Sequence, residues 1–164
     1  MKLPIVLTEC IRVPHDFHAR FSAVSKAYHY HILNREVPCA VGSNYVWHIH
    51  TPLDAGTMNQ CCMLLCGTHD FKSFENTGAP RRSTVRTVFM ARMDRQDQDR
   101  LVCKICADGF LKNMVRNIVG TLVDAGRHKI TVQDFQTILS AKDRSQAGTT
   151  APAWGLFLKQ VNYT

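Results

Sequence analysis

The chain has 164 residues, a length that suits one compact domain with its own hydrophobic core. It is 45% hydrophobic and 20% charged, as in soluble globular proteins, and no apolar run approaches the roughly 18 residues that a membrane span needs. The formal charge of +7 favours a polyanionic partner such as nucleic acid, although a basic surplus also serves solubility alone.

The amino-terminal residues and the cysteines bear on the compartment. The opening stretch has one lysine and a short apolar run that polar residues interrupt, so we expect no export signal. Seven cysteines is an odd number, and they are spread through apolar segments, which indicates reduced thiols rather than a disulfide framework. The sequence therefore predicts a cytoplasmic protein.

The first predicted elements are three strands and a helix. Residues 4–13 and 26–34 combine β-branched and aromatic residues with partial period-two alternation, and residues 44–49 form a shorter run of the same kind. A helix is expected after them, with Thr51 as its N-cap and Gly67 following its last apolar residue.

The second half of the chain predicts a hairpin, two helices and a final strand. Residues 83–94 and 100–108 alternate at period two across a polar link, which is typical of an antiparallel hairpin. A helix is expected over about 109–125, and another begins at Thr131, which has Asp134 in capping-box spacing. Residues 156–163 close as a strand. The order of elements predicts an α+β fold, a mostly antiparallel sheet with helices packed on one face.

Two loops that contain glycine and proline separate these elements, over 74–86 and 143–155. The first carries Arg81, Arg82 and Arg86, which suit contacts with phosphates that need no sequence readout. The simpler interpretation is a solvated surface loop.

Several patterns that suggest metal sites have simpler explanations. Cys103 and Cys106 have zinc-site spacing, but residues three apart on a strand point to opposite faces. Cys61, Cys62 and Cys66 fit the apolar side of a helix as small hydrophobes. His29 with His31, and His48 with His50, share strand faces, where they could bind a metal or simply face solvent. We expect no metal and no cofactor, and the familiar hydrolase and nucleotide-binding motifs do not occur.

Arg116 stands beside the apolar stripe of the 109–125 helix, which comprises Leu111, Val115, Ile118 and Leu122, and Lys112 precedes it by one turn. An arginine at the edge of such a stripe can extend its guanidinium to solvent. A buried guanidinium would instead need an anionic partner, a carboxylate or a phosphate, because an unpaired buried charge costs about 3–5 kcal/mol.

Five stretches carry a family resemblance: DFHARFSAVSKAYHY, GTHDFKSF, VRTV, DGFLKNMVRNIVGTLVDAG and AKDRSQAGTTAPAWGLFL. In this order and spacing they resemble TruA-type tRNA pseudouridine synthases, over nearly the whole chain. The resemblance covers only the second, carboxy-terminal domain of that family. It implies isomerisation of uridines in the tRNA anticodon stem-loop without cofactor or metal, by a homodimer of two-domain subunits.

The resemblance also implies roles for individual residues. Tyr28 matches the family's tyrosine that stacks against the flipped-out uracil, because stacking holds a base while it turns. Arg116 matches the basic residue that pairs with the catalytic aspartate, and Leu156 matches the apolar residue that lines the pocket. Arg20 and Arg86 are further candidates for contacts with the tRNA backbone, as are Arg81, Arg82 and Lys112.

The catalytic aspartate of that family belongs to an Arg-Thr-Asp-Ala-Gly motif in the first domain, and this sequence has no such motif. Asp-Ala-Gly occurs at 54–56 and 124–126, but neither has the preceding arginine and threonine. For Asp70 and Asp108 we expect structural roles, such as N-capping by Asp108. The chain is therefore expected to be inactive without the aspartate-bearing domain. The alternative is an RNA-binding or dimerisation module that has lost the chemistry.

Overall fold

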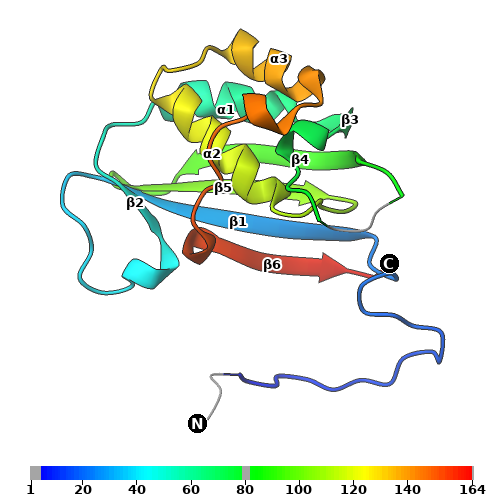
Figure 1. The fold of residues 1–164 in the computed structure, drawn as a ribbon. Helices are drawn as coiled ribbons and strands as arrows, with labels where there is room; N and C mark the ends of the chain where they lie inside the picture. Colours follow the sequence, from blue (N-terminus) through cyan, green and yellow to red (C-terminus); the bar gives the residue numbers. More distant parts are fainter. Residues whose placement is uncertain (1–4, 79–81, 164) are drawn as a thin grey trace.

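A single mixed sheet is the base of the fold in the computed structural model, which describes residues 5–78 and 82–163. Five strands follow the order β2-β1-β5-β4-β3, and β6 pairs with the free part of β1 (Figure 1). Only the pairing of β1 with β2 is parallel. The strands are β1 Ser25–Asn34, β2 Trp47–Ile49, β3 Gly67–Asp70, β4 Val85–Arg95, β5 Arg100–Ala107 and β6 Leu156–Asn162.

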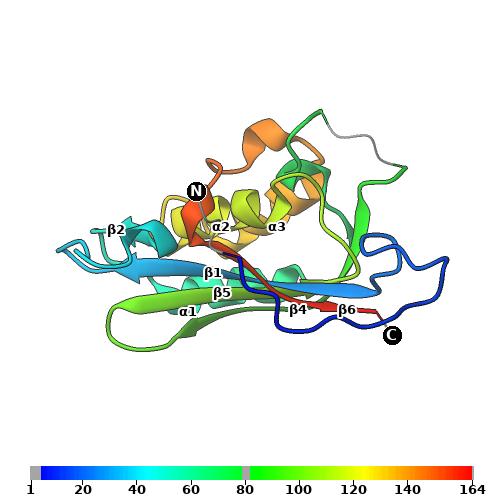
Figure 2. The same ribbon diagram turned by 90° about the horizontal axis from the view of Figure 1, so that it is seen from below.

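Three α-helices cover one face of this sheet: α1 Ala55–Leu64, α2 Met114–Gly126 and α3 Val132–Ala141. Figure 2 shows the same molecule from below, a quarter turn from Figure 1. The predicted α+β fold, a mostly antiparallel sheet with helices on one face, is confirmed. The described helices include none long and apolar enough to cross a membrane.

The alternation of side chains along β1 divides the sheet into two different surfaces. Tyr30 and Ile32 are fully buried in the core beneath the helices. His29 and His31 alternate with them in sequence and therefore point to the helix-free face. Alternate residues of one strand thus serve two separate surfaces.

The elements with the clearest patterns are confirmed. β1, β6 and the β4–β5 hairpin lie where the alternation predicts them, and the 96–99 link is largely exposed. At the start of α3 the Thr131 hydroxyl accepts from the Asp134 amide, and the Asp134 carboxylate accepts from the Thr131 amide. Both bonds of the predicted capping box are therefore present.

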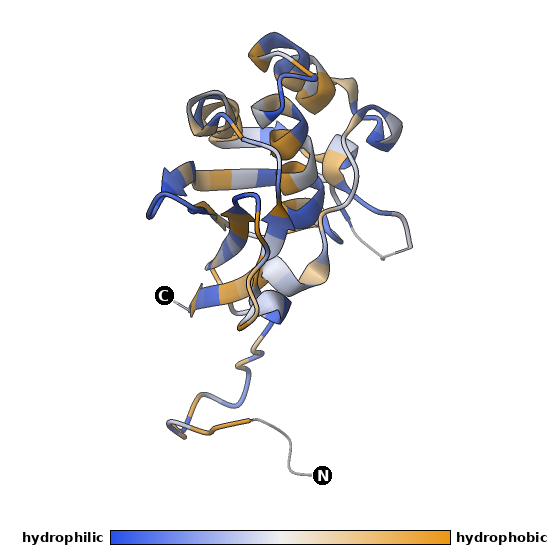
Figure 3. Cartoon of the chain, turned by 90° about the vertical axis from the view of Figure 1, so that its left-hand side faces the viewer, coloured by the Kyte–Doolittle hydropathy of each residue, from blue (hydrophilic) through white to orange (hydrophobic). Residues whose placement is uncertain are grey.

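The predicted strand over 4–13 is wrong for the described residues 5–13, which form no secondary structure. Ile5, Val6 and Leu7 are 76%, 84% and 81% exposed. Figure 3 shows this amino-terminal segment running away from the body of the molecule. Alternation marks a segment able to join a sheet, but a strand needs a neighbour for its backbone hydrogen bonds, and none lies alongside.

The start of α1 differs from the prediction. Its N-cap is Asp54, whose carboxylate accepts from the Thr57 amide at 3.1 Å. Thr51 serves tertiary contacts instead, since its carbonyl accepts from Asn34 and its hydroxyl from Arg127. Gly67, which was expected only to follow the helix, begins the unpredicted strand β3.

Two other boundaries were placed wrongly. α2 begins at Met114 rather than at 109, because Asn113 adopts a left-handed conformation with φ of 60° that no α-helix can contain. Lys112 therefore precedes the helix. In the stretch 44–49, a short 3-10 turn, Ser43–Tyr45, comes before the three residues of β2.

The cysteines lie mostly where expected. Cys103 belongs to the core and Cys106 points to the other face, so this pair does not chelate. Cys61 and Cys62 are buried, but Cys66 is exposed because α1 ends two residues before it. No group of three or more metal-binding side chains occurs in the part of the chain that the structure describes.

Candidate active site

Arg116 lies in the first turn of α2, where two neutral oxygen atoms hold its guanidinium. Nε donates to the Ala151 carbonyl at 2.6 Å, and one terminal nitrogen donates to the Asn113 side chain at 3.2 Å. The Ala151 amide in turn donates to the Arg116 carbonyl at 3.1 Å. Arg116 and Ala151 are thus joined by two reciprocal hydrogen bonds, which fix the direction of the arginine side chain.

No carboxylate forms an ion pair with Arg116 within residues 5–78 and 82–163. The side chain is half-buried, so part of its charge remains accessible. Neutral carbonyl and amide oxygens satisfy donors but leave the net charge in place. The arrangement can therefore still accept an anion beside α2.

Tyr28 lies on β1 on the helix side, where its ring packs edge-on against Phe110 with centroids 5.0 Å apart. Leu156 begins β6 and pairs with Tyr30 of β1. Tyr30 follows Tyr28 by two residues and so lies on the same face of the sheet. The Tyr30 hydroxyl donates to the Pro152 carbonyl at 2.7 Å. Tyr28 and Leu156 therefore border the same part of the sheet, which the 147–155 loop flanks.

Tyr30 links this part of the sheet to Arg116. Burial raises the pKa of the Tyr30 hydroxyl, and the nearby Arg116 charge opposes that rise. Tyr30 and Arg116 bond to neighbouring carbonyls of the same loop, Pro152 and Ala151. The predicted residues Tyr28, Arg116 and Leu156 thus converge at the meeting of β1, β6 and α2.

A hub of neutral polar groups around Arg144 fixes the loop that holds Arg116. The Arg144 guanidinium donates to Asn76, to the Ala147 carbonyl, to Asn117 and to the Thr150 hydroxyl. Asn117 is fully buried on α2, and its side-chain oxygen also accepts a hydrogen bond from the Thr150 hydroxyl at 2.6 Å. Burial lowers the pKa of Arg144, although so basic a group stays charged. Three separate segments of chain are thereby tied together.

The same loop lies directly against α2. A Cβ added at Gly120 would lie 1.7 Å from the Thr149 carbonyl oxygen, so only glycine permits this approach. The Gly148 amide donates to the Thr121 hydroxyl at 2.9 Å, one residue further along the helix. The loop and α2 consequently form one rigid unit around Arg116.

Arg20 and Arg86 are far apart in sequence but border one small cavity of about 370 Å³. Phe110, the ring that packs against Tyr28, also lines this cavity. Asp108 lines it too, and its carboxylate accepts from the Thr87 amide at 3.1 Å. Asp108 thus supports β4 and does not N-cap α2, which corrects the expected capping role.

The remaining basic candidates are more scattered. The Lys112 ammonium donates to the Thr77 carbonyl at 3.0 Å and so holds the 75–78 segment. Arg82 is exposed. Arg81 lies outside the described residues. Arg86 belongs to β4 rather than to the preceding loop.

Sequence reasoning missed three residues that shape this site: Phe110, Asn117 and Arg144. All three fall within the stretches that carry the family resemblance, which was the available signal. Nothing in local spacing indicates that Arg144 meets Asn117, since 27 residues separate them. The geometry offers an aromatic ring, an accessible guanidinium and an apolar wall, but no attacking carboxylate beside Arg116 in the described part of the chain.

Comparison with known proteins identifies the family of the chain. The sequence pattern described as tRNA pseudouridine synthase matches residues 61–164. The chain belongs to the tRNA pseudouridine synthase family. tRNA pseudouridine synthase A of Clostridium acetobutylicum is 43% identical over 159 residues, which make up 97% of this chain and 65% of that protein. tRNA pseudouridine synthase A 1 of Desulfotalea psychrophila is 44% identical over 154 residues, 90% of this chain and 61% of that protein.

The chain thus spans less than two thirds of the length of these two pseudouridine synthases. The relative of the same name from Orientia tsutsugamushi, 42% identical, is covered over 56% of its length.

Proposed function

We propose that this chain forms the nucleoside-binding half of a tRNA pseudouridine synthase that acts on uridines of the anticodon stem-loop. The observation that carries the proposal is the half-buried Arg116 guanidinium, which is fixed by Ala151 and Asn113 yet has no carboxylate partner among the described residues. Family membership supplies the reaction class.

Each converging residue has a role in this proposal. Tyr28 stacks against the extruded uracil, which holds the base while allowing it to rotate. Leu156 supplies the apolar wall that keeps water from the base. Arg116 holds the catalytic carboxylate in its ionised form, because an opposite charge nearby favours ionisation. Arg20, Arg82, Arg86 and Lys112 contact the RNA backbone, with Arg81 as a further candidate.

The reaction needs a carboxylate, and none forms an ion pair with Arg116 in the described residues 5–78 and 82–163. The glycosidic carbon–nitrogen bond of uridine must break, and the base must turn and rejoin the ribose through carbon. A tyrosine, an arginine and a leucine cannot stabilise the cleaved sugar in that way. We therefore propose that an aspartate-bearing domain, in cis or in trans, completes the site, within a homodimer as the family resemblance implies.

The test is a uridine isomerisation assay on an anticodon stem-loop labelled at carbon 5 of uracil. The chain is assayed alone and after genetic fusion to the amino-terminal part of the Clostridium acetobutylicum relative that it does not match. Tritium release is expected only from the fusion. Substitution Tyr28→Ala in the fusion should abolish release, whereas Lys129→Gln, on the exposed end of the helical layer, should not.

Equal release from the chain alone and from the fusion would contradict the division of labour. No release from a folded fusion that binds the stem-loop would instead favour a module that binds RNA without chemistry. Dimerisation without RNA binding would favour a dimerisation module instead.

A further inference from the structure

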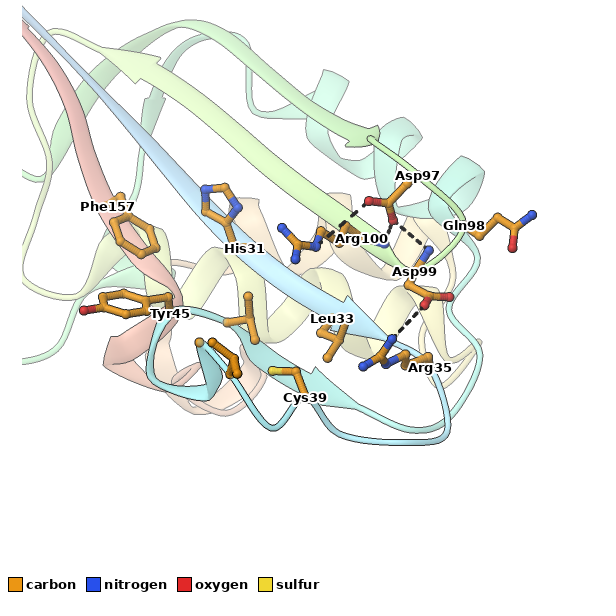
Figure 4. Close-up of a pocket in the computed structure, with 13 residues that line it drawn as sticks. His31, Leu33, Arg35, Cys39, Tyr45, Asp97, Gln98, Asp99, Arg100 and Phe157 are labelled. Atoms are coloured by element: carbon orange, nitrogen blue, oxygen red, sulfur yellow. Dashed lines mark hydrogen bonds and ion pairs between the residues drawn. The ribbon is translucent and has the colours of Figure 1, made fainter.

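A cavity in the described part of the chain lies away from the candidate active site. It measures about 810 Å³ and opens on the helix-free face of the sheet, between β1, the 35–46 loop and the 96–99 link (Figure 4). His31 and Phe157 form its floor, and both point away from the helices because they alternate with the core residue Tyr30 and with Leu156. None of the roles proposed above uses this cavity.

Aromatic rings form one side of the cavity. Tyr45 and Phe157 face each other with centroids 6.2 Å apart and an angle of 31° between their planes. His31 packs edge-on against Phe157 at 5.1 Å. Tyr45 is 63% exposed, so one face of its ring is open to a ligand. Exposed rings on an open sheet are typical stacking platforms for unpaired bases.

Two arginines form the opposite side. In Figure 4 the Arg100 guanidinium lies between His31 and Asp97, and Arg35 reaches Asp99. These ion pairs measure 4.0 Å and 3.2 Å and are well exposed, so each contributes little stability and is easily exchanged. A phosphate can accept two charge-assisted hydrogen bonds from the planar fork of a guanidinium. It can therefore compete with these aspartates for the two arginines.

The surrounding face carries an excess of positive charge. Arg92, Lys104 and Lys159 join the two arginines, against the three acids Asp94, Asp97 and Asp99. Burial is the main cause that lowers the pKa of His29 and of His31, and the neighbouring cations Lys104 and Arg100 lower it further. A polyanion is therefore favoured over a neutral or cationic ligand here.

We propose that this cavity is a second RNA contact, in which an unpaired base stacks on Tyr45 beside Phe157 while the adjoining phosphates bind Arg100 and Arg35. The inference rests on the proposed function, since that function makes RNA the expected polyanion. It adds a contact on the opposite side of the sheet from the uracil site, so one RNA would touch both faces around an edge, or two RNA segments would bind separately.

The cavity also holds a reporter for this contact. Cys39 lines it together with Tyr45 and Phe157, so a photoreactive base bound here would lie beside all three side chains. The chain is mixed with a tRNA transcript that contains 4-thiouridine, irradiated, digested and sequenced by mass spectrometry. The expected crosslinked peptides contain Cys39, Tyr45 or Phe157.

Affinity of the unmodified tRNA is measured in parallel for two substitutions on exposed side chains. Tyr45→Ala and Arg100→Gln should each weaken binding about tenfold, as expected for loss of one stacked base or one bidentate phosphate contact. Arg100→Gln should also make the dependence of affinity on salt less steep by about one counterion. The control is Lys129→Gln, which removes the same single charge from the helical side and should leave affinity within about twofold.

Three results would overturn the inference. The first is RNA binding without crosslinks in this cavity and without an effect of Tyr45→Ala; isomerisation by the fusion could then still succeed, so the proposed function would survive. The second is equal affinity for uridine monophosphate and for tRNA at this cavity, which would make it a small-molecule site. The third is a dimer of the chain that Tyr45→Ala dissociates, which would make this face an interface between copies. Crosslinks here with an inactive fusion would support the contact and count against the catalytic proposal alone.

Discussion

At the scale of single residues, Arg116 shows how a charge can be positioned without being neutralised. Its reciprocal bonds with Ala151 use a backbone carbonyl and a backbone amide, which carry no net charge. A carboxylate in their place would have formed a closed ion pair. The neutral partners fix the orientation and leave the electrostatic attraction for an incoming group.

Replacing Arg116 with methionine tests this arrangement. Arg116→Met keeps the side-chain length and the fold but leaves the Ala151 carbonyl without its donor, so the free energy of unfolding should fall by only about 1–2 kcal/mol. The isomerase activity of the fusion should disappear. Urea denaturation measures the first effect and tritium release the second.

Arg116→Lys is the matched control, since it keeps the charge but loses the fork of donors. It should retain partial activity. The pH optimum should shift, because lysine holds the catalytic carboxylate less firmly than arginine does. Unfolding of Arg116→Met at 25 °C would show that the guanidinium already has a strong partner within this chain.

The two histidines of β1 predict how stability depends on pH. Their pKa is lowered in the folded chain, so below the ordinary value of about 6.5 the unfolded state binds more protons than the folded state. The histidines add no pH dependence above about pH 7, and stability should decline as the pH falls through 6.5 toward the lowered pKa. Asp54, Asp70, Asp134 and Asp143 also have lowered pKa values, but their contribution is lost only below about pH 4.

Denaturation midpoints between pH 7.5 and 5 measure the histidine effect. His29→Gln combined with His31→Gln should flatten the curve in this window and leave the acidic decline unchanged. A curve of the parent chain that rises as the pH falls from 7 to 5 would contradict the lowered pKa values.

At the scale of elements, local pattern predicted what local interactions determine. The alternation of β1, the β4–β5 hairpin and the Thr131–Asp134 capping box all depend on residues within one short stretch. The start of α2 could not be predicted because the spacing of apolar residues does not reveal the left-handed conformation of Asn113. The prediction of Thr51 as N-cap was wrong. Its carbonyl and its hydroxyl accept hydrogen bonds from Asn34 and Arg127, which are distant in sequence.

The same division applies to the candidate site. The family stretches identified Tyr28, Arg116 and Leu156, and the structure brings these residues to one region. The Arg144 hub was beyond reach because its contacts join three segments that the sequence separates. The catalytic roles of Tyr28, Arg116 and Leu156 remain predictions of the proposed function.

The loop that carries Ala151 yields a prediction at this scale. Gly120→Ala would place a methyl group 1.7 Å from the Thr149 carbonyl oxygen, so the loop must move away from α2. Overpacking of this kind destabilises by about 1–3 kcal/mol and should loosen Arg116 at the same time. Thermal denaturation measures the first effect, and a loss of turnover larger than the loss of RNA affinity measures the second.

Gly56→Ala is the control, since the added methyl would meet only the Asp54 side chain, at 3.1 Å. It should change stability less and leave turnover intact. If Gly120→Ala matched the parent chain in both measurements, the contact between loop and helix would not determine the site.

At the scale of the whole molecule, the amino-terminal segment 5–13 is exceptional. It holds a series of exposed apolar side chains, Ile5, Val6, Leu7, Ile11 and Val13, outside the packed body. An exposed segment of this composition favours association of chains in solution. The stability of the fold does not draw on it, since the core lies wholly between sheet and helices.

Deleting residues 1–13 tests that independence. The free energy of unfolding should change by no more than about 0.5 kcal/mol, while light scattering at high protein concentration should decrease. The anchor formed by Phe17 and Tyr163, whose rings lie 5.0 Å apart, remains in the shortened chain. A loss of more than about 2 kcal/mol would show that the segment packs on the body.

The alternation along β1 also limits which insertions and deletions this strand can tolerate. Tyr28 and Tyr30 belong to one side of the sheet, and His29 and His31 to the other. Inserting or removing one amino acid within the strand would exchange these two sets and ruin both surfaces at once. A change of two would restore the parity, so natural variants should differ in β1 by an even number of residues or by none.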